Sequence, residues 1–283
     1  GGEHVTVTSL TPDGAEPHDL ELSPKMVDSL ASADAVVYLA GFQGAVDEAV
    51  EQHAPKTVID VSPAAQLVAI DSTSNHPGED EGTDEAQSGE AQSGEAADHD
   101  HEHADHDHHH DMSMDPHFWL DPARMANAAT LVGDKLAEAD PTNAETYKAN
   151  AQALNKELTS LGDNLVTKTS TCQIKTFVTA HTAFGYLADR TGLTQVGISG
   201  LDPESSPSPA RLAEIGKIAK DQGVTTIFTE ALIDPKVAQT LADDLGISTV
   251  VLDPIESQTD SSKDYAAVMN DNIDALTKAN NCQ

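Results

Sequence analysis

Histidines alternate with acidic residues in one short stretch of this sequence. Residues 98–111 read DHDHEHADHDHHHD and contain seven of the 13 histidines of the chain. Neutral imidazole is the commonest nitrogen ligand for zinc, copper and nickel in proteins, and carboxylates add oxygen ligands. A purification tag is usually a pure histidine run at a terminus, whereas this stretch is internal and mixed with acids. The composition therefore predicts metal binding.

Four residues outside this stretch have the type and the position that a tight metal site needs. A selective site requires ligands on the fixed ends of secondary-structure elements. His18 is expected in the loop after a strand at 5–10, and His117 lies just before a predicted helix. His181 and Asp253 directly follow predicted strands. Three imidazoles and one carboxylate would complete the tetrahedral coordination of zinc.

Each of these residues also has an ordinary structural explanation. A single histidine at a strand end is more often a loop or capping residue, and an aspartate before proline usually forms a turn. Their joint placement favours a site, because ligands of open parallel sheets bind outside the carboxyl ends of the strands. His4, His53 and His76 have no comparable context and are assigned to the surface or to loops.

The alternation of short apolar runs with helical patterns predicts an α/β protein with parallel sheets. Strands are expected at 5–10, 34–40, 57–62, 174–180, 194–198, 225–229 and 248–252. Helices are expected at 24–30, 43–52, 122–139, 143–168, 182–191, 208–222, 235–245 and 262–279. The helix at 143–168 is polar over much of its surface, which is typical of a helix that bridges two domains.

We therefore predict two lobes, each with βα units, and a metal site in the cleft between them. The N-terminal α/β lobe covers 1–141, a long rigid linking helix covers 142–168, and the C-terminal α/β lobe covers 169–283. Residues 71–111 are rich in Glu, Asp, Gly, Ser, Gln and His. Such a composition buries too little apolar surface to order itself, so we expect a disordered acidic loop in the first lobe.

Charge and length limit the classes of partner. The 283 residues carry a net charge of −33, which argues against nucleic acid and anionic lipid as partners and favours cations. No apolar run approaches the roughly 20 residues that span a bilayer. The chain starts at Gly-Gly-Glu without a signal peptide, so we expect a fragment or a processed form of a longer protein.

Two cysteines, Cys172 and Cys282, lie far apart and form no CxxC pair, so a zinc-thiolate or redox motif is absent from the sequence. A structural disulfide is favoured if the protein is exported. Two unrelated buried thiols are the alternative.

Several motifs follow one another along nearly the whole chain. They are PHDLELSP around His18, DPHFWLDP around His117, TAHTAFGYLADRTGL around His181, and FTEALIDPKVAQTLADDLG followed by VVLDPIE. With these motifs the chain resembles the metal-binding substrate proteins of ABC transporters, in particular the zinc-uptake (ZnuA/TroA-like) cluster. The cysteine pair resembles that of actinobacterial members. Members also carry about one further strand and helix before the segment that matches GGEHVTV.

The resemblance implies that His18, His117 and His181 are zinc ligands and that Asp253 is an acidic fourth ligand, although some members use water or another carboxylate there. It implies a role for Glu230 beside the cleft without coordination of the metal. It further implies a monomer outside the cytoplasm, at the cell surface or in the periplasm, held by a lipoprotein anchor that is not in this chain. Such a protein captures Zn²⁺ and delivers it to a membrane permease.

Other functions remain open at this point. A zinc hydrolase or hydratase could use three histidines and an open coordination position, but the sequence has no HExxH motif. A surface metal buffer or adhesin is a third possibility. The histidine-rich stretch would collect zinc weakly and raise its concentration near the tight site; its alternative role is a solubilising acidic linker.

Overall fold

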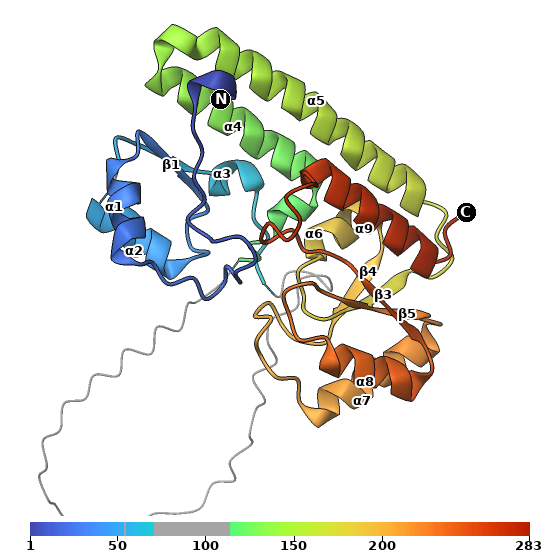
Figure 1. The fold of residues 1–283 in the computed structure, drawn as a ribbon. Helices are drawn as coiled ribbons and strands as arrows, with labels where there is room; N and C mark the ends of the chain where they lie inside the picture. The colour runs from blue at the N-terminus through green and yellow to red at the C-terminus, as the bar shows by residue number, and fades with distance from the viewer. Residues whose placement is uncertain (54, 71–113) are drawn as a thin grey trace, which may run out of the picture.

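The computed structural model of the chain describes residues 1–53, 55–70 and 114–283 (Figure 1). This part contains two parallel β-sheets with helices packed against them, as the α/β prediction requires. In the smaller sheet, β1 (Ala35–Tyr38) pairs with β2 (Thr57–Asp60). The histidine-rich stretch at 98–111 and the predicted acidic loop lie outside the described residues.

The larger sheet has four strands in the order β4-β3-β5-β6. They are β3 (Thr176–Thr179), β4 (Thr194–Gly197), β5 (Thr226–Thr229) and β6 (Ser248–Val251). All neighbouring strands are parallel, so their carboxyl ends share one edge of the sheet. β3 and β5 lie in the middle and are buried at every position, as expected of parallel strands covered on both faces.

Local capping signals mark the starts of four of the α-helices in the described residues. Ser23, Asp121, Ser208 and Asp264 each accept a hydrogen bond from a backbone N–H in the first turn of the helix that follows. The helices are α1 (Pro24–Ser32), α2 (Gly44–His53), α3 (Ser62–Ala65), α4 (Pro122–Ala139), α5 (Ala144–Thr169), α6 (Gly185–Thr191), α7 (Pro209–Asp221), α8 (Lys236–Leu245) and α9 (Tyr265–Ala279). Short 3₁₀ helices are η1 (Gly2–His4), η2 (Phe118–Leu120) and η3 (Pro141–Asn143).

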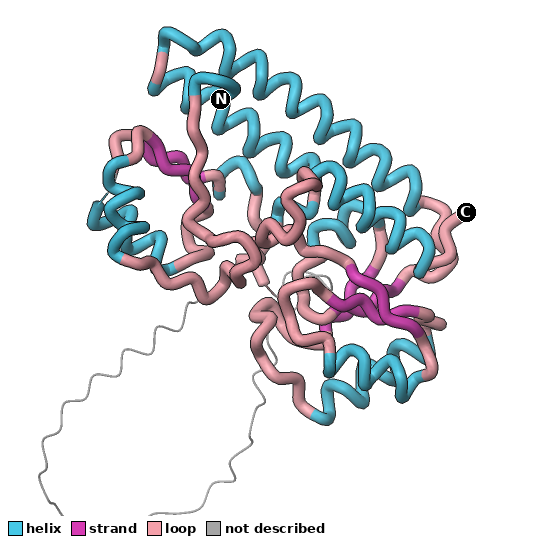
Figure 2. Tube along the Cα trace, in the orientation of Figure 1, coloured by secondary structure: helices cyan, strands magenta, loops and turns pink. Residues whose placement is uncertain are grey.

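Helices cover both faces of the four-stranded sheet (Figure 2). On one face the core joins the sheet to α5, α6 and α9 and includes Phe177, Phe184 and Ile273. On the other face α7 and α8 pack through Ile215 and Leu241. Because this core holds the strands in place, the residues that follow each strand are presented from a fixed edge.

The long helices α4 and α5 pack against each other and run past both sheets (Figure 1). α4 contacts α3 and β2, while α5 contacts α6 and α9. Gly133 allows their close approach, because a Cβ atom there would collide with Ala151. The segment predicted as a bridging helix forms α5, which packs against α4 and also contacts α9. The division into lobes at residues 141 and 168 stays a prediction.

Two expectations about other segments have different outcomes. The predicted disulfide is present and links Cys172, before β3, to Cys282, after α9. The predicted strand at 5–10 is wrong: these residues have no regular structure, and the Val7 side chain is 86% exposed. A β-branched run forms a strand only where a neighbouring strand pairs with its backbone. In the described residues β1 and β2 pair only with each other, so residues 5–10 have no strand partner.

None of the helices in the described ranges combines the length and the apolar content that spanning a membrane requires.

Candidate metal centre

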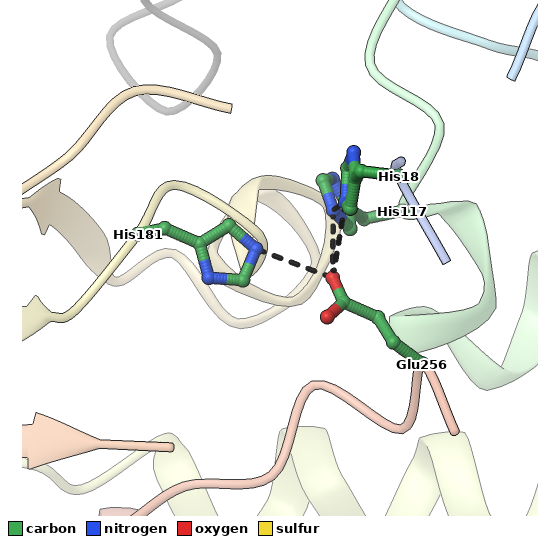
Figure 3. A group of neighbouring side chains, drawn as sticks. All are labelled: His18, His117, His181 and Glu256. Carbon is green, nitrogen blue, oxygen red and sulfur yellow. Dashed lines mark hydrogen bonds and ion pairs between the residues drawn. The ribbon is translucent and has the colours of Figure 1, made fainter. Parts of the chain in front are cut away.

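Three histidines and one glutamate converge at a buried point between the two sheets (Figure 3). His18, His117, His181 and Glu256 each offer one ligand atom, and these atoms all lie within 4.8 Å of one another. They come from four separate segments of the chain. The structure therefore brings together the three predicted histidines, with Glu256 as the acid beside them.

His117 lies just before η2 and is held by Asp115, two residues earlier. The Oδ1 atom of Asp115 accepts hydrogen bonds from the backbone N–H of His117 at 2.9 Å and from its Nδ1 at 2.7 Å. The hydroxyl of Tyr186 donates to the backbone carbonyl of Asp115 at 2.6 Å. These contacts leave the Nε2 atom of His117 facing Glu256 Oε1, at 3.1 Å.

His181 lies two residues beyond the end of β3 and is held in the same way by Glu230, which directly follows β5. Glu230 accepts from the backbone N–H of His181 through Oε1 at 3.1 Å and from Nδ1 through Oε2 at 2.7 Å. The Nε2 atom then lies 3.2 Å from Glu256 Oε1. Glu230 contacts the imidazole and is not a member of the four-residue group. That it does not coordinate the metal stays a prediction.

His18 is the most loosely held of the three. It lies in the irregular segment before α1, and its Nε2 is 3.4 Å from Glu256 Oε1 and 3.2 Å from His117 Nε2. Its ring meets Phe42 edge to face, with 5.0 Å between the ring centroids. The backbone N–H of His18 donates to Glu16 Oε1 at 3.0 Å.

Glu256 stands in the segment after β6, and this segment is tied to the His117 motif. The indole N–H of Trp119 donates to the backbone carbonyl of Pro254 at 2.8 Å. The hydroxyl of Tyr265 donates to the carbonyl of Trp119 at 2.6 Å. Segments more than 100 residues apart in the sequence therefore position the glutamate against the histidines.

The structure does not bring Asp253 into this group, which corrects its prediction as the fourth ligand. Its Oδ1 instead accepts from the backbone N–H of Ile255 at 2.8 Å and so forms the turn that the residue type also suggested. The turn places the acid three residues later, Glu256, at the histidines. The sequence signal for Glu256 was its position close behind a predicted strand, in VVLDPIES.

The charges of the site depend on each other. Burial acts to lower the pKa of all three histidines, and it does lower the pKa of His18. At His181 the nearby carboxylates, Glu230 foremost, outweigh burial and raise the pKa to about 10. Asp115 likewise raises the pKa of His117 above its ordinary value despite complete burial.

Glu256 responds in the opposite sense. Burial alone would raise its pKa, but the three imidazoles that donate to it hold its pKa far below the usual range. The metal-free site is thus a carboxylate surrounded by imidazole N–H groups. A cation that takes the place of these protons would meet three nitrogen atoms and one carboxylate oxygen.

A cavity of about 320 Å³ borders the site. Glu16 and Ala180 line it near the histidines, and Glu204 and Asp234 line it where the protein is exposed. Burial, together with the charge of Glu256, raises the pKa of Glu16 to about 7.

Comparison with known proteins shows that the chain is similar to zinc-binding proteins. The chain is 33% identical over 280 residues to the zinc-binding protein AdcA of Streptococcus pyogenes; the match covers 97% of this chain and 52% of that protein. The chain thus spans about half the length of these AdcA relatives. It is also 33% identical over 279 residues to the high-affinity zinc uptake system protein ZnuA of Bacillus subtilis, covering 95% of this chain and 79% of that one.

The fold is shared with a solved zinc-bound structure. The Zn(II)-bound ZnuA-like domain of AdcA from Streptococcus pneumoniae superposes with a TM-score of 0.73 and 29% identity, over 99% of this chain and 92% of that one. The family model described as zinc-uptake complex component A, periplasmic, matches residues 1–279. The chain therefore belongs to the ZnuA family of zinc-uptake complex components.

Proposed function

We propose that this chain captures Zn²⁺ as cargo with His18, His117, His181 and Glu256, as the substrate-binding component of an ABC transporter for zinc uptake. The observation that carries the proposal is the convergence of three imidazole Nε2 atoms on one carboxylate oxygen, at 3.1 to 3.4 Å. Two of the imidazoles have a carboxylate on Nδ1, the arrangement that orients histidine for metal binding.

The set of ligand atoms favours zinc over harder cations. Zinc accepts imidazole nitrogen and carboxylate oxygen in tetrahedral sites, whereas Mg²⁺, Ca²⁺ and Mn²⁺ prefer oxygen ligands. Four protein ligands leave no open position for a water that could be activated. We therefore infer a carrier rather than a zinc hydrolase or hydratase, in keeping with a family whose description is a component of zinc uptake.

We infer that the chain acts outside the cytoplasm, the location that the family description gives as periplasmic. The names of the Bacillus and Streptococcus relatives support zinc as the cargo. A membrane permease as the receiving partner, a monomeric state and a lipoprotein anchor complete the proposal.

The histidine-rich segment at 98–111 would serve the tight site as a weak collector of zinc. No lysine or arginine lies between Lys56 and this segment. The segment ends shortly before Met114, so zinc held there would be close to His117 in sequence. Deletion of 98–111 should lower the number of zinc ions bound while leaving one tight site. Loss of the tight site on deletion would make the segment the site itself.

The proposal is tested by zinc titration of the metal-free protein in competition with a chromophoric chelator. Wild type should bind one zinc tightly, and His181→Ala should lose this tight isotherm while weak binding persists. His53→Ala is the matched control, because His53 is an exposed histidine at the end of α2. A tight isotherm that His181→Ala leaves unchanged would remove His181 from the site. An esterase assay of the zinc-loaded protein tests the hydrolase alternative.

A further inference from the structure

Two of the three site histidines share one pattern of support. Asp115 accepts from both the backbone N–H and Nδ1 of His117, and Glu230 accepts from both the backbone N–H and Nδ1 of His181. Each carboxylate therefore fixes the loop and the ring together. A metal-bound imidazole needs such an acceptor, because its remaining proton must sit on the nitrogen that does not bind the metal.

His18 has only half of this pattern. Glu16-Pro17-His18 repeats the acid-proline-histidine order of Asp115-Pro116-His117, and Glu16 Oε1 accepts from the backbone N–H of His18 at 3.0 Å. The Nδ1 of His18 and the Oε2 of Glu16 are both buried, and neither has a hydrogen-bond partner among the described residues. The His18 side chain is only 5% exposed, so solvent does not readily supply the missing partner.

The tautomer of His18 explains why the pair is open in the metal-free protein. Its Nε2 lies 3.4 Å from the carboxylate oxygen of Glu256, and a neutral ring that donates to this oxygen carries no proton on Nδ1. The ring nitrogen that lacks a proton cannot donate to Glu16. Figure 3 shows the second nitrogen of this ring pointing away from Glu256.

Zinc would reverse this arrangement. When Nε2 coordinates the metal, its proton leaves to solvent and Nδ1 takes one up, so the ring stays neutral and gains a buried donor. A buried donor without an acceptor is unfavourable. Above pH 7, where Glu16 is ionised, its free oxygen can accept this proton, and its other oxygen already accepts from the backbone N–H of His18. Glu230 shows that the two oxygens of one glutamate can serve the N–H and the Nδ1 of one histidine.

We propose that Glu16 is the positioning residue of His18, and that zinc binding closes a hydrogen bond from His18 Nδ1 to Glu16 Oε2. The cavity of about 320 Å³ that Glu16 lines leaves room for its carboxylate to turn. This bond would complete a third carboxylate–imidazole pair and slow the release of the ion. The inference deepens the proposed function and rests on it.

The tautomer is the direct test. Long-range ¹H–¹⁵N spectra of the histidines, recorded on the wild-type protein with and without zinc, distinguish Nδ1–H from Nε2–H. We expect His18 to change from Nε2–H to a slowly exchanging Nδ1–H on zinc binding, and the slow exchange to be lost in Glu16→Gln. A zinc-loaded wild type whose His18 Nδ1–H exchanges as fast as it does in Glu16→Gln would overturn the inference.

Dissociation kinetics give an independent measure. Glu16→Gln keeps a carbonyl oxygen for the backbone N–H of His18 but presents an NH₂ group where Oε2 stood. Zinc captured by excess chelator in stopped flow should leave this variant about 10-fold faster than wild type, as for other residues that support metal ligands. Glu204→Gln is the matched control, because its exposed carboxylate lines the same cavity, and it should release zinc at the wild-type rate.

The outcomes separate the two proposals. If wild type binds no zinc tightly, the proposed function fails. If wild type binds zinc tightly but Glu16→Gln releases it at the wild-type rate, only the role of Glu16 fails.

Discussion

The carboxylate of Asp253 accepts a hydrogen bond from the backbone N–H of Ile255 at 2.8 Å, and this contact shapes the turn that places Glu256 against the three histidines of the candidate metal centre. Ile255 has a φ angle of 55°, which a β-branched residue adopts only when its surroundings impose it. Asn272 holds Asp253 on both sides, accepting from its N–H at 2.8 Å and donating to its carbonyl at 2.6 Å. Asp253 thus supports the turn, and Glu256 stands at the histidines.

Exchange of the two acids for their amides should separate these roles. Glu256→Gln removes a negative oxygen from the centre, and we expect the dissociation constant for zinc to rise about 100-fold. Asp253→Asn keeps a carbonyl oxygen for the Ile255 N–H, so its dissociation constant should change by less than about threefold. Competition titrations of both variants check this. The opposite order of effects would restore Asp253 as the ligand.

Zinc binding should release protons at neutral and mildly alkaline pH. The pKa of metal-free His181 is raised to about 10, so this ring carries an extra proton at pH 7.5 that zinc must displace. The raised pKa of His117 acts in the same direction. Affinity should therefore increase as pH rises from 6 to 9. Calorimetry in two buffers with different ionisation enthalpies should give about one proton or more released per zinc. An affinity that is flat over this range would contradict histidine coordination.

The same shift predicts how the metal-free protein responds to alkaline pH. The pKa of His181 is about 10 in the folded state, against an ordinary value of about 6.5 in the unfolded chain. The free energy of unfolding gained from its protonation is therefore fully present below pH 6.5 and is lost as the pH rises toward 10. The Tm of the metal-free protein should fall by about 5 °C or more between pH 7 and pH 10. In metal-free His181→Gln this fall should be smaller, and equal slopes for the two proteins would refute the assignment.

The carboxylates behind the histidines should tune affinity without binding the metal. Glu230→Gln keeps a carbonyl oxygen but loses the charge on His181 Nδ1, and Asp115→Asn does the same at His117. Each substitution should weaken zinc binding about 10- to 100-fold while the stoichiometry of the tight site stays at one. Glu214→Gln, an exposed glutamate that pairs with Arg211 on α7, is the control and should leave affinity unchanged. Loss of the tight stoichiometry in Glu230→Gln would make Glu230 a ligand.

Most elements of the fold could be predicted because their signals are local. Ser208 before Pro209 and Asp121 before Pro122 mark the starts of α7 and α4, since a cap and a proline act within one turn of helix. The segment at 5–10 has the composition of a strand but no strand partner, and pairing depends on residues far away in the chain. Composition alone could not supply that partner.

The sequence by itself pointed to three of the four residues of the candidate site and to the kind of sheet that presents them. His117 and His181 could be found because strand ends and motif order are visible in one dimension. Tertiary structure alone decided which acid completes the group, because Asp253 and Glu256 both follow β6 and only the turn at Ile255 separates them. It also decided which carboxylate supports His181, since Glu230 reaches this imidazole across 49 residues of chain.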